Sequence, residues 1–139
     1  MTENEQDSVR VRAVMTSSPR RIDGLATVAE AAALMGREGI SSLVIDRRHE
    51  GDEFGLVTVS DIAAKVIGAN RSPARTNVYE IMSKPVLTVD ADMNIKYAIR
   101  FLSRFGVSRA LVTEGGKLVG IVTTRDMVFR CLCDPPAKD

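Results

Sequence analysis

The sequence predicts an α+β (α/β-like) fold in which two copies of one unit, each β-α-β-β-α, pack on each other. The main observation is a seven-residue pattern that occurs twice, as G-L-V-T-V-S-D at 55–61 and as G-I-V-T-T-R-D at 120–126. In both copies a short apolar strand ends at a Thr, and an apolar helical run follows the Asp three residues later. Two copies in matching places indicate a repeated unit with a repeated strand-to-helix junction.

The spacing of other residues also indicates a duplication. Met82 follows Met15 by 67 positions (82 minus 15), and Gly106 follows Gly39 by the same 67 (106 minus 39). The two seven-residue patterns are only 65 positions apart (120 minus 55). The first copy therefore carries two extra residues, and the charged loop at 46–53 is the natural place for them. An insertion within a loop, at a constant order of elements, is typical of a duplicated fold.

The first repeat is predicted at 9–69. Its expected elements are a short strand or entry segment at 9–14, a helix from Thr27 to Gly39, strands at 41–45 and 54–59, and a helix at 61–68. Thr27 and Glu30 fit a capping box at the start of the first helix. Gly39 fits the left-handed residue that ends it.

The second repeat is predicted at 80–133, after a polar linker at 70–79. Its expected elements are an opening segment at 81–83, a strand at 87–89, a helix that Gly106 ends, strands at 110–112 and 118–122, and a helix at 126–132. Asp90 or Asp92 is expected to cap the first of these helices. The adjacent Gly115 and Gly116 predict a tight hairpin turn. Residues 1–8 are expected to be disordered, and 134–139 to form a C-terminal tail.

Composition excludes several classes of protein. The net charge of +1 and the 4% aromatic content give no basic face or stacking platform for nucleic acid. No apolar run approaches the roughly 20 residues that span a bilayer, and the polar start of the chain is unlike a signal peptide. We therefore expect no membrane association and a cytoplasmic location. Cys131 and Cys133, with His49 in a polar loop, do not complete a metal or redox site.

The doubled patterns resemble a tandem pair of cystathionine-β-synthase (CBS) domains, also called a Bateman module, here as a stand-alone CBS domain protein. Besides the seven-residue pattern, two features occur twice: the openings V-M-T (14–16) and I-M-S (81–83), and a helix-ending glycine in G-I-S (39–41) and G-V-S (106–108). The resemblance implies two CBS repeats packed with pseudo-two-fold symmetry. It also implies a regulatory module, not an enzyme. Its ligand would be AMP, ADP, ATP or S-adenosylmethionine, and ligand binding would change the angle between the halves, which a partner protein would read.

The resemblance also implies which residues hold the ligand. In the second repeat they are Ser83, Lys84, Pro85 and Val86 at the adenine, Ser108 and Arg109 near phosphate, Thr123 and Arg125 near ribose and phosphate, and Asp126 at the ribose hydroxyls. In the first repeat they are Thr16, Pro19 and Arg20 at the base, with Ser41, Ser42, Thr58, Ser60 and Asp61. Arg109 and Arg125 stand where the first repeat has Ser42 and Ser60. Since an Arg fork binds phosphate oxygens bidentately, the second site is expected to prefer phosphorylated ligands.

Three alternatives compete with a nucleotide sensor. The Thr and Asp of each junction have a purely structural interpretation as helix caps, because both residue types are favoured there. An enzyme is disfavoured because the only histidine has no nucleophile or acid partner in the sequence. The remaining alternative is a ligand-free dimeric interaction scaffold. A homodimer through the helices at 61–68 and 126–132 is expected in either case, because both helices are apolar on more than one face.

Overall fold

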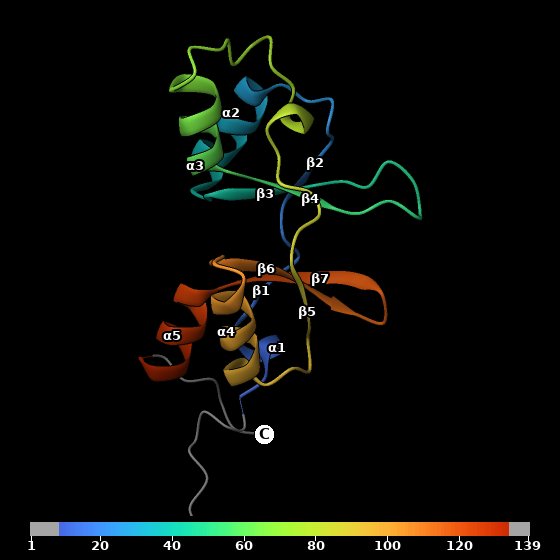
Figure 1. Cartoon of the computed structure of the whole chain (residues 1–139), viewed down its shortest axis with the longest axis vertical. Helices are drawn as coiled ribbons and strands as arrows, with labels where there is room; N and C mark the ends of the chain where they lie inside the picture. The colour runs from blue at the N-terminus through green and yellow to red at the C-terminus, as the bar shows by residue number, and fades with distance from the viewer. Residues whose placement is uncertain (1–8, 134–139) are drawn as a thin grey trace, which may run out of the picture. The chain divides into compact units, whose positions relative to one another are not determined.

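The computed structural model describes residues 9–133, so the predictions for 1–8 and 134–139 lie outside the described residues. The chain divides into two compact units, and each contains one sheet and its helices (Figure 1). The first-repeat unit is the continuous stretch Arg20–Val86. The second-repeat unit combines the described residues 9–19 with 87–133. The α+β class and the β-α-β-β-α order of each repeat are confirmed.

The first-repeat unit is a three-stranded sheet covered by helices. Its elements, in chain order, are β2 (Arg21–Ile22), α2 (Val28–Glu38), β3 (Ser42–Ile45), β4 (Gly55–Thr58), α3 (Val59–Ile62), the π-helical turn η2 (Ala63–Ile67) and the 3-10 turn η3 (Val78–Glu80). The strand order is β2-β3-β4, with β2 parallel and β4 antiparallel to β3. Helices α2 and α3 lie on one face of the sheet (Figure 1). Buried Val28, Met35, Leu43, Val57 and Val66 belong to the core between these layers.

The second-repeat unit has a four-stranded sheet with the same layering. Its elements are α1 (Val11–Val14), β1 (Thr16–Ser17), β5 (Thr88–Asp90), α4 (Ile95–Arg104), β6 (Arg109–Glu114), β7 (Lys117–Thr123) and α5 (Thr124–Leu132). The strand order is β1-β7-β6-β5. Apolar side chains from α1, α4, α5 and the sheet form one core, which includes Val14, Leu102, Ala110, Val122 and Met127.

Several local predictions are confirmed by the backbone. Thr27 caps α2, since its Oγ1 accepts a hydrogen bond from the Glu30 amide at 3.1 Å. Gly39 ends α2 in the left-handed conformation, at φ 67°. Gly115 and Gly116 both have positive φ in the β6–β7 turn, as a tight hairpin requires. These positions are governed by local chemistry, which explains why sequence patterns find them.

Three local predictions are wrong. Residues 11–14 form helix α1 rather than a strand, because Val11 and Val14 lie one turn apart and both enter the core. The cap of α4 is Asn94, whose side chain accepts from the Lys96 amide at 2.8 Å, rather than Asp90 or Asp92. The helix expected at 61–68 begins earlier, at Val59, and widens into η2.

The opening segment of each repeat joins the sheet of the other repeat. Thr16 and Ser17 pair antiparallel with Ile121 and Gly120 of β7. In the first-repeat unit, Ser83 bridges to Leu56 of β4. Each compact unit therefore contains the opening segment of one repeat and the seven-residue pattern of the other, so the units differ from the sequence repeats at 9–69 and 80–133.

The glycine that begins each seven-residue pattern makes room for this exchanged segment. A Cβ at Gly120 would lie 2.6 Å from Met15 Sδ and 2.9 Å from the Thr16 carbonyl oxygen. A Cβ at Gly55 would lie 2.5 Å from Met82 Sδ. At Gly120 the clash includes the backbone of the opening segment, which could not move away without disturbing its pairing with β7. At Gly55 the clash is with the flexible Met82 side chain, which would have to move.

The long β3–β4 loop at 46–54 is attached to the segment after η3 by an ion pair. The Lys84 ammonium lies 2.8 Å from Asp52 Oδ1 and 2.9 Å from Oδ2. The Arg48 amide donates to the same carboxylate at 3.0 Å. The Asp52 side chain is only 10% exposed and that of Lys84 only 24%. These hydrogen bonds, chiefly the one from Lys84, hold the pKa of Asp52 well below its usual value.

We predict that Gly120→Ala destabilises the protein by about 1–3 kcal/mol, because the new methyl group would meet the Thr16 backbone and Met15. The measurement is the free energy of unfolding by urea denaturation. Gly36→Ala is the matched control, since a Cβ at Gly36 meets nothing within 4 Å. It is expected to be neutral or to stabilise α2 by roughly 0.5–1 kcal/mol. Equal effects of the two substitutions would contradict the close-approach explanation.

We also predict that the Asp52–Lys84 pair makes stability depend on pH. A carboxylate whose pKa is depressed by folding stabilises the folded state above its unfolded pKa, which is about 3.9 for Asp. The contribution is lost as the pH falls below that value. A double-mutant cycle with Asp52→Asn and Lys84→Met, followed by thermal unfolding, should give a favourable coupling at pH 6 that shrinks at pH 3. A coupling that is independent of pH would refute the assignment.

Candidate functional site

The first strand-to-helix junction is held by a reciprocal pair of hydrogen bonds between Thr58 and Asp61. Thr58 Oγ1 accepts from the Asp61 amide at 3.1 Å, and Asp61 Oδ2 accepts from the Thr58 amide at 2.9 Å. The Thr58 hydroxyl also donates to Oδ2, at 3.0 Å. The capping interpretation of these two residues is therefore confirmed. The other carboxylate oxygen, Oδ1, lies 3.5 Å from Lys65 Nζ.

The second junction shares the threonine cap of the first, with Thr123 and Asp126. Thr123 Oγ1 accepts from the Asp126 amide at 2.9 Å and caps α5. Arg130 Nε lies 3.9 Å from Asp126 Oδ1. Both junctions thus combine a threonine cap, a half-buried carboxylate and a cation four residues further along the helix.

The cation after each Asp also contacts the exchanged opening segment. Lys65 Nζ donates to the Ile81 carbonyl oxygen at 3.1 Å. Arg130 donates to the carbonyl oxygens of Val14 and Met15 at 3.2 and 3.1 Å. Sequence reasoning missed both cations, although each stands four residues after the Asp of its pattern and could have been found by that spacing.

The residues that enter the central strands lie opposite the motif threonines. Ser42 pairs with Thr58 in the β3–β4 ladder, and Arg109 pairs with Thr123 in the β6–β7 ladder. One position earlier, the Ser41 carbonyl accepts from the Val59 amide at 3.0 Å. In the other unit, the Ser108 carbonyl accepts from the Thr124 amide at 2.9 Å. Each unit therefore brings its motif and its strand-entry pair together, as the sequence predicts.

The position before each motif Asp is exposed in both units. Ser60 lies in the first turn of α3 and Arg125 in the first turn of α5. The Arg125 guanidinium lies over the ring of Phe129, 4.7 Å from its centroid. This stacking holds the Arg125 charge along the first turns of α5.

The opening-turn residues lie in the unit of the other repeat, because of the segment exchange. Ser83, Lys84, Pro85 and Val86 belong to the unit that contains Thr58, Ser60 and Asp61. Thr16 and Pro19 belong to the unit that contains Thr123, Arg125 and Asp126. Arg20 lies in the first-repeat unit, where it forms an ion pair with Glu38 at 2.9 Å. The sequence-based prediction, which grouped each opening turn with the motif of its own repeat, is therefore wrong on this point.

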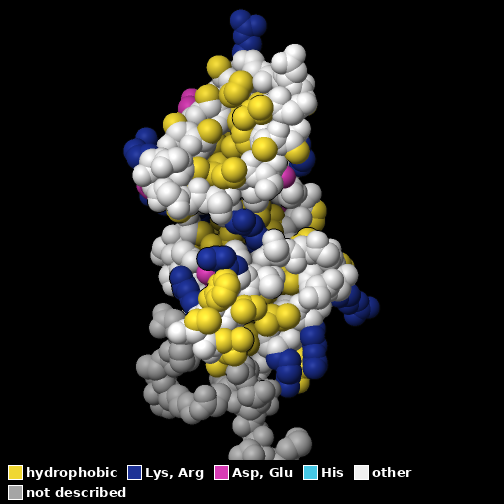
Figure 2. Space-filling model, turned by 90° about the vertical axis from the view of Figure 1, so that its left-hand side faces the viewer, with side chains coloured by type: hydrophobic (Ala, Val, Ile, Leu, Met, Phe, Trp, Pro, Cys, Tyr) yellow, Lys and Arg dark blue, Asp and Glu magenta, His cyan; other side chains and the backbone are white. Residues whose placement is uncertain are grey.

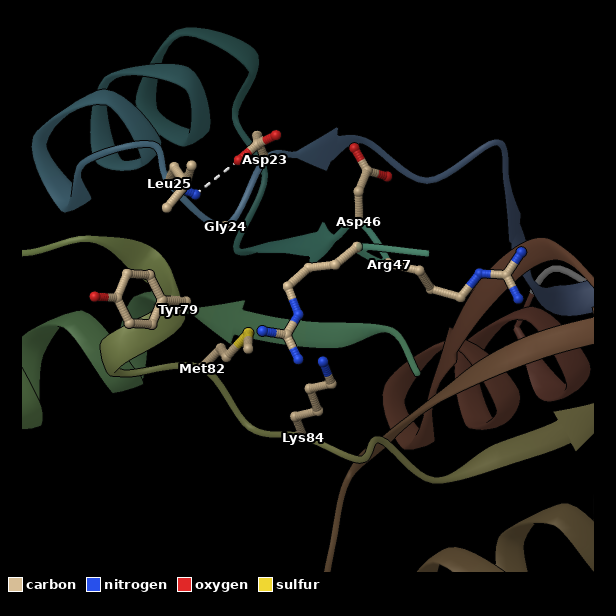
Figure 3. Close-up of a pocket in the computed structure, with 9 residues that line it drawn as sticks. Asp23, Gly24, Leu25, Asp46, Arg47, Tyr79, Met82 and Lys84 are labelled. Atoms are coloured by element: carbon tan, nitrogen blue, oxygen red, sulfur yellow. Dashed lines mark hydrogen bonds between the residues drawn. The ribbon is translucent and has the colours of Figure 1, made fainter. Parts of the chain in front are cut away.

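A pocket of about 710 Å³ lies within the first-repeat unit (Figure 3). It lies at the Ile45 end of β3, whereas Thr58 pairs with the other end of that strand. Lys84 is the one predicted ligand residue in its lining. Asp23, Gly24 and Leu25 come from the turn before α2, and Tyr79 and Met82 from η3 and the segment after it (Figure 3). The long loop contributes Asp46, Arg47 and Arg48. Sequence reasoning missed this pocket; the two-residue insertion in the loop was the one signal that pointed to it.

Two features that the described residues lack bear on the site. Within 9–133, no group of three or more His, Cys, Asp and Glu side chains is arranged to hold a metal ion. In the same part of the chain, no helix is long and apolar enough to cross a membrane.

Comparison with known proteins identifies the family of the chain. The model of the CBS domain matches residues 11–68 and 78–132. The uncharacterized protein MK0525 of Methanopyrus kandleri is 37% identical over 119 residues, which cover 84% of this chain and 57% of that protein. The inosine-5′-monophosphate dehydrogenase of Korarchaeum cryptofilum is 30% identical over 127 residues, which cover 89% of this chain and 24% of that enzyme.

A solved structure supports the same assignment. The hexameric CBS-CP12 protein from bloom-forming cyanobacteria is similar with a TM-score of 0.84 and 34% identity, covering 94% of this chain and 76% of that chain. The chain spans about half the length of the first curated relatives that it matches. The two family matches, at the positions of the two repeats, establish that the chain belongs to the CBS domain family and contains a tandem pair of CBS domains.

Proposed function

We propose that the chain is a regulatory module that binds an adenosine compound, such as AMP, ADP, ATP or S-adenosylmethionine, and signals its presence to a partner protein. The observation that carries the proposal is the junction of threonine, carboxylate and strand-entry residues, which occurs twice with the same strand register. A ribose offers two neighbouring hydroxyl donors, and a carboxylate accepts from both. Part of an inosine-5′-monophosphate dehydrogenase is similar to this chain. The substrate in that enzyme's name is a nucleotide, and this supports a role in nucleotide binding.

Capping and ribose binding are compatible at the same carboxylate. Asp61 uses Oδ2 for the cap, whereas Oδ1 has only a longer contact, of 3.5 Å, with Lys65. An ionised carboxylate has about four lone-pair positions, so an oxygen engaged with the helix start does not exhaust its acceptors. Asp126 has the same place in α5. In the first-repeat unit, the hydrogen bonds to Oδ2 would hold the Asp61 carboxylate in position for a ligand.

The two sites would differ in their preference for charge. Arg125 and Arg109 occupy the second junction, where the first has Ser60 and Ser42. Guanidinium groups bind phosphate oxygens more strongly than neutral hydroxyls do. In the first-repeat unit the nearby cation Lys84 is already paired with Asp52. We therefore place phosphorylated ligands at the second site and less charged ligands at the first.

Self-association is part of the proposal. The helices at 61–68 and 126–132 expose Ile67, Val128, Phe129 and Leu132, and the similar CBS-CP12 protein is described as hexameric. The alternative function is a dimeric interaction scaffold without a ligand. Exposed apolar helix faces are expected for both functions and do not distinguish between them. Ligand titration is therefore the measurement that separates the two.

We predict saturable binding of at least one of AMP, ATP, S-adenosylmethionine and NADH in calorimetric titration of protein refolded after denaturing extraction. A hundredfold excess of ligand over its Kd should stabilise the protein by about 2.7 kcal/mol. Asp126→Ala and Asp61→Ala each remove one motif carboxylate, and thermal unfolding checks that both variants remain folded. Loss of binding in one or both variants supports the proposal. Binding that survives the double substitution would place the ligand elsewhere, and no heat from any of the four would favour the scaffold.

We predict that Arg125→Gln weakens binding of AMP or ATP at least tenfold and changes adenosine binding little, because the strong contacts of the guanidinium would be with phosphate, which adenosine lacks. Ser60→Ala, at the equivalent position of the first repeat, is the matched control and should have little effect on either ligand. Competition titration of adenosine against AMP provides the measurement. A parallel loss for adenosine and AMP would rule out a phosphate-specific role.

A further inference from the structure

The pocket in the first-repeat unit has the size and lining of a site for a small molecule. Its volume of about 710 Å³ lies in the range of ligand pockets, roughly 300–1,000 Å³. All of the residues in its lining belong to the continuous unit Arg20–Val86. Leu25, Tyr79 and Met82 form its apolar wall, and Leu25 and Tyr79 are 74% and 50% exposed. Two large apolar side chains are thus open to a ligand.

Hydrogen bonds hold the two sides of this apolar wall together. The Tyr79 amide donates to the Gly24 carbonyl oxygen at 3.1 Å. The Asn77 side chain donates to the Leu25 carbonyl oxygen at 2.7 Å. These bonds join η3 to the turn before α2, although the two segments are far apart in the sequence. The wall is therefore formed by the fold itself, as is usual for ligand pockets.

The lining also contains three cations, Arg47, Arg48 and Lys84. Lys84 and Arg48 share one carboxylate, since Asp52 lies 2.8 Å from Lys84 Nζ and 3.4 Å from Arg48 Nε. Arg47 donates to a backbone carbonyl oxygen of the loop at 3.1 Å, and no acid within residues 9–133 forms a salt bridge with it. A guanidinium has five N–H donors, so both arginines keep donors for an anion.

The two acids in the lining are already engaged. Asp46 lies 3.6 Å from Arg21 Nη1, and Asp23 accepts a hydrogen bond from the Leu25 amide at 2.8 Å (Figure 3). When Arg21 and Asp52 are counted with the lining, four cations stand against three carboxylates. The excess of positive charge favours an anionic ligand over a cationic one.

This pocket is separate from the strand-to-helix junction of the same unit. Thr58 pairs with Ser42 at the start of β3, whereas Asp46 follows the end of that strand. The stretch from Ser42 to Asp46 spans about 13 Å of extended chain. Neither Thr58 nor Asp61 is in the pocket lining. A ligand in the pocket would therefore not occupy the junction carboxylate.

We propose that the pocket is a second ligand site, for a small aromatic compound that carries a carboxylate or a phosphate group. The ring packs on Tyr79 and Leu25, and the anionic group binds Arg48 and Lys84. The proposal does not rest on the binding of adenosine compounds at the junctions, since the pocket uses neither motif carboxylate.

Asp52 competes with such a ligand for the same cations. Its carboxylate accepts from Lys84 and from the Arg48 amide, so an incoming anion must share or replace these contacts. Lys84 follows Ser83, which bridges to Leu56 of β4. A bound anion would therefore weaken the attachment of the β3–β4 loop to the opening segment of the second repeat.

Titration followed by 1H–15N NMR tests the site in the full chain. The probes are naphthalene-1-carboxylate and phenyl phosphate, and 1-naphthalenemethanol is the neutral match of the first. A neutral match is needed because Figure 2 shows other apolar side chains at the surface, over the helices of this unit. Amide signals of 23–25, 46–48 and 79–84 are expected to shift saturably with an anionic probe. The neutral alcohol should bind at least about fivefold more weakly.

Two substitutions test the contact with the ring. Tyr79→Leu keeps an apolar side chain but removes the ring, and it should weaken binding of naphthalene-1-carboxylate at least about threefold. Tyr97→Leu is the matched control, because Tyr97 is similarly exposed, at 54%, but lies in α4 of the other unit. This control should leave the affinity unchanged.

Three further substitutions test the contact with the anion. Arg48→Gln and Lys84→Met should each weaken binding of the carboxylate at least about fivefold, with little change for the alcohol. Asp52→Asn should instead tighten binding of the carboxylate at least about threefold, because it removes the competing anion. The dispersion of the amide signals checks that each variant remains folded.

Four results would overturn the proposal. Shifts confined to 58–61 or 123–126 would assign the probe to a junction, and shifts that do not saturate at millimolar concentration would mean that there is no site. Equal affinity for the carboxylate and the alcohol would remove the role of the cations. Weaker binding in a folded Asp52→Asn variant would contradict the competition. None of these results bears on the junctions as sites for AMP or ATP, which the substitutions at Asp61 and Asp126 test.

Discussion

The close approach of each opening segment to a glycine is the contact on which the rest of the fold depends. Met15 lies against Gly120 and Met82 against Gly55, so closely that a Cβ on either glycine would force its neighbour to shift. Through these contacts each sheet gains a strand or bridge from the opening segment of the other repeat. The glycine of each seven-residue pattern is thus a packing residue. The threonine and aspartate that follow it are positioned by the same strand.

The candidate ligand residues share their partners with the fold. Each motif Asp caps or flanks a helix start, and the cation one turn later holds a carbonyl of the opening segment. A ligand bound at the carboxylate would lie near a cation that also fixes the exchanged segment. Ligand binding and packing would therefore be linked through a single side chain, Lys65 in one unit and Arg130 in the other. Such shared contacts are the physical basis on which a ligand alters structure at a distance.

The sequence predicted what is determined locally. Periodicity and caps located the main helices, and Gly39, Gly115 and Gly116 had the expected backbone conformations. The exchange of opening segments could not be predicted from the sequence patterns. Hydrophobic alternation and residue spacing indicate the conformation of a segment, but not the strand with which it pairs. Helix α1 was missed for a related reason. Its amides at Val11 and Arg12 bond to the carbonyls of Met93 and Ala91, so tertiary contacts hold a helix too short to form alone.

The segment exchange also imposes an order on how the molecule assembles. The first-repeat unit is continuous, so all of its strands exist once the chain has been synthesised as far as Val86. The second-repeat unit is discontinuous, since β1 near the start pairs with β7, more than a hundred residues later. Its sheet cannot close until β7 is available, and that long loop raises the entropic cost of closure. Until β7 is synthesised, β1 lacks the strand with which it pairs. The sheet of the first-repeat unit can therefore form before the opening segment of the first repeat is paired.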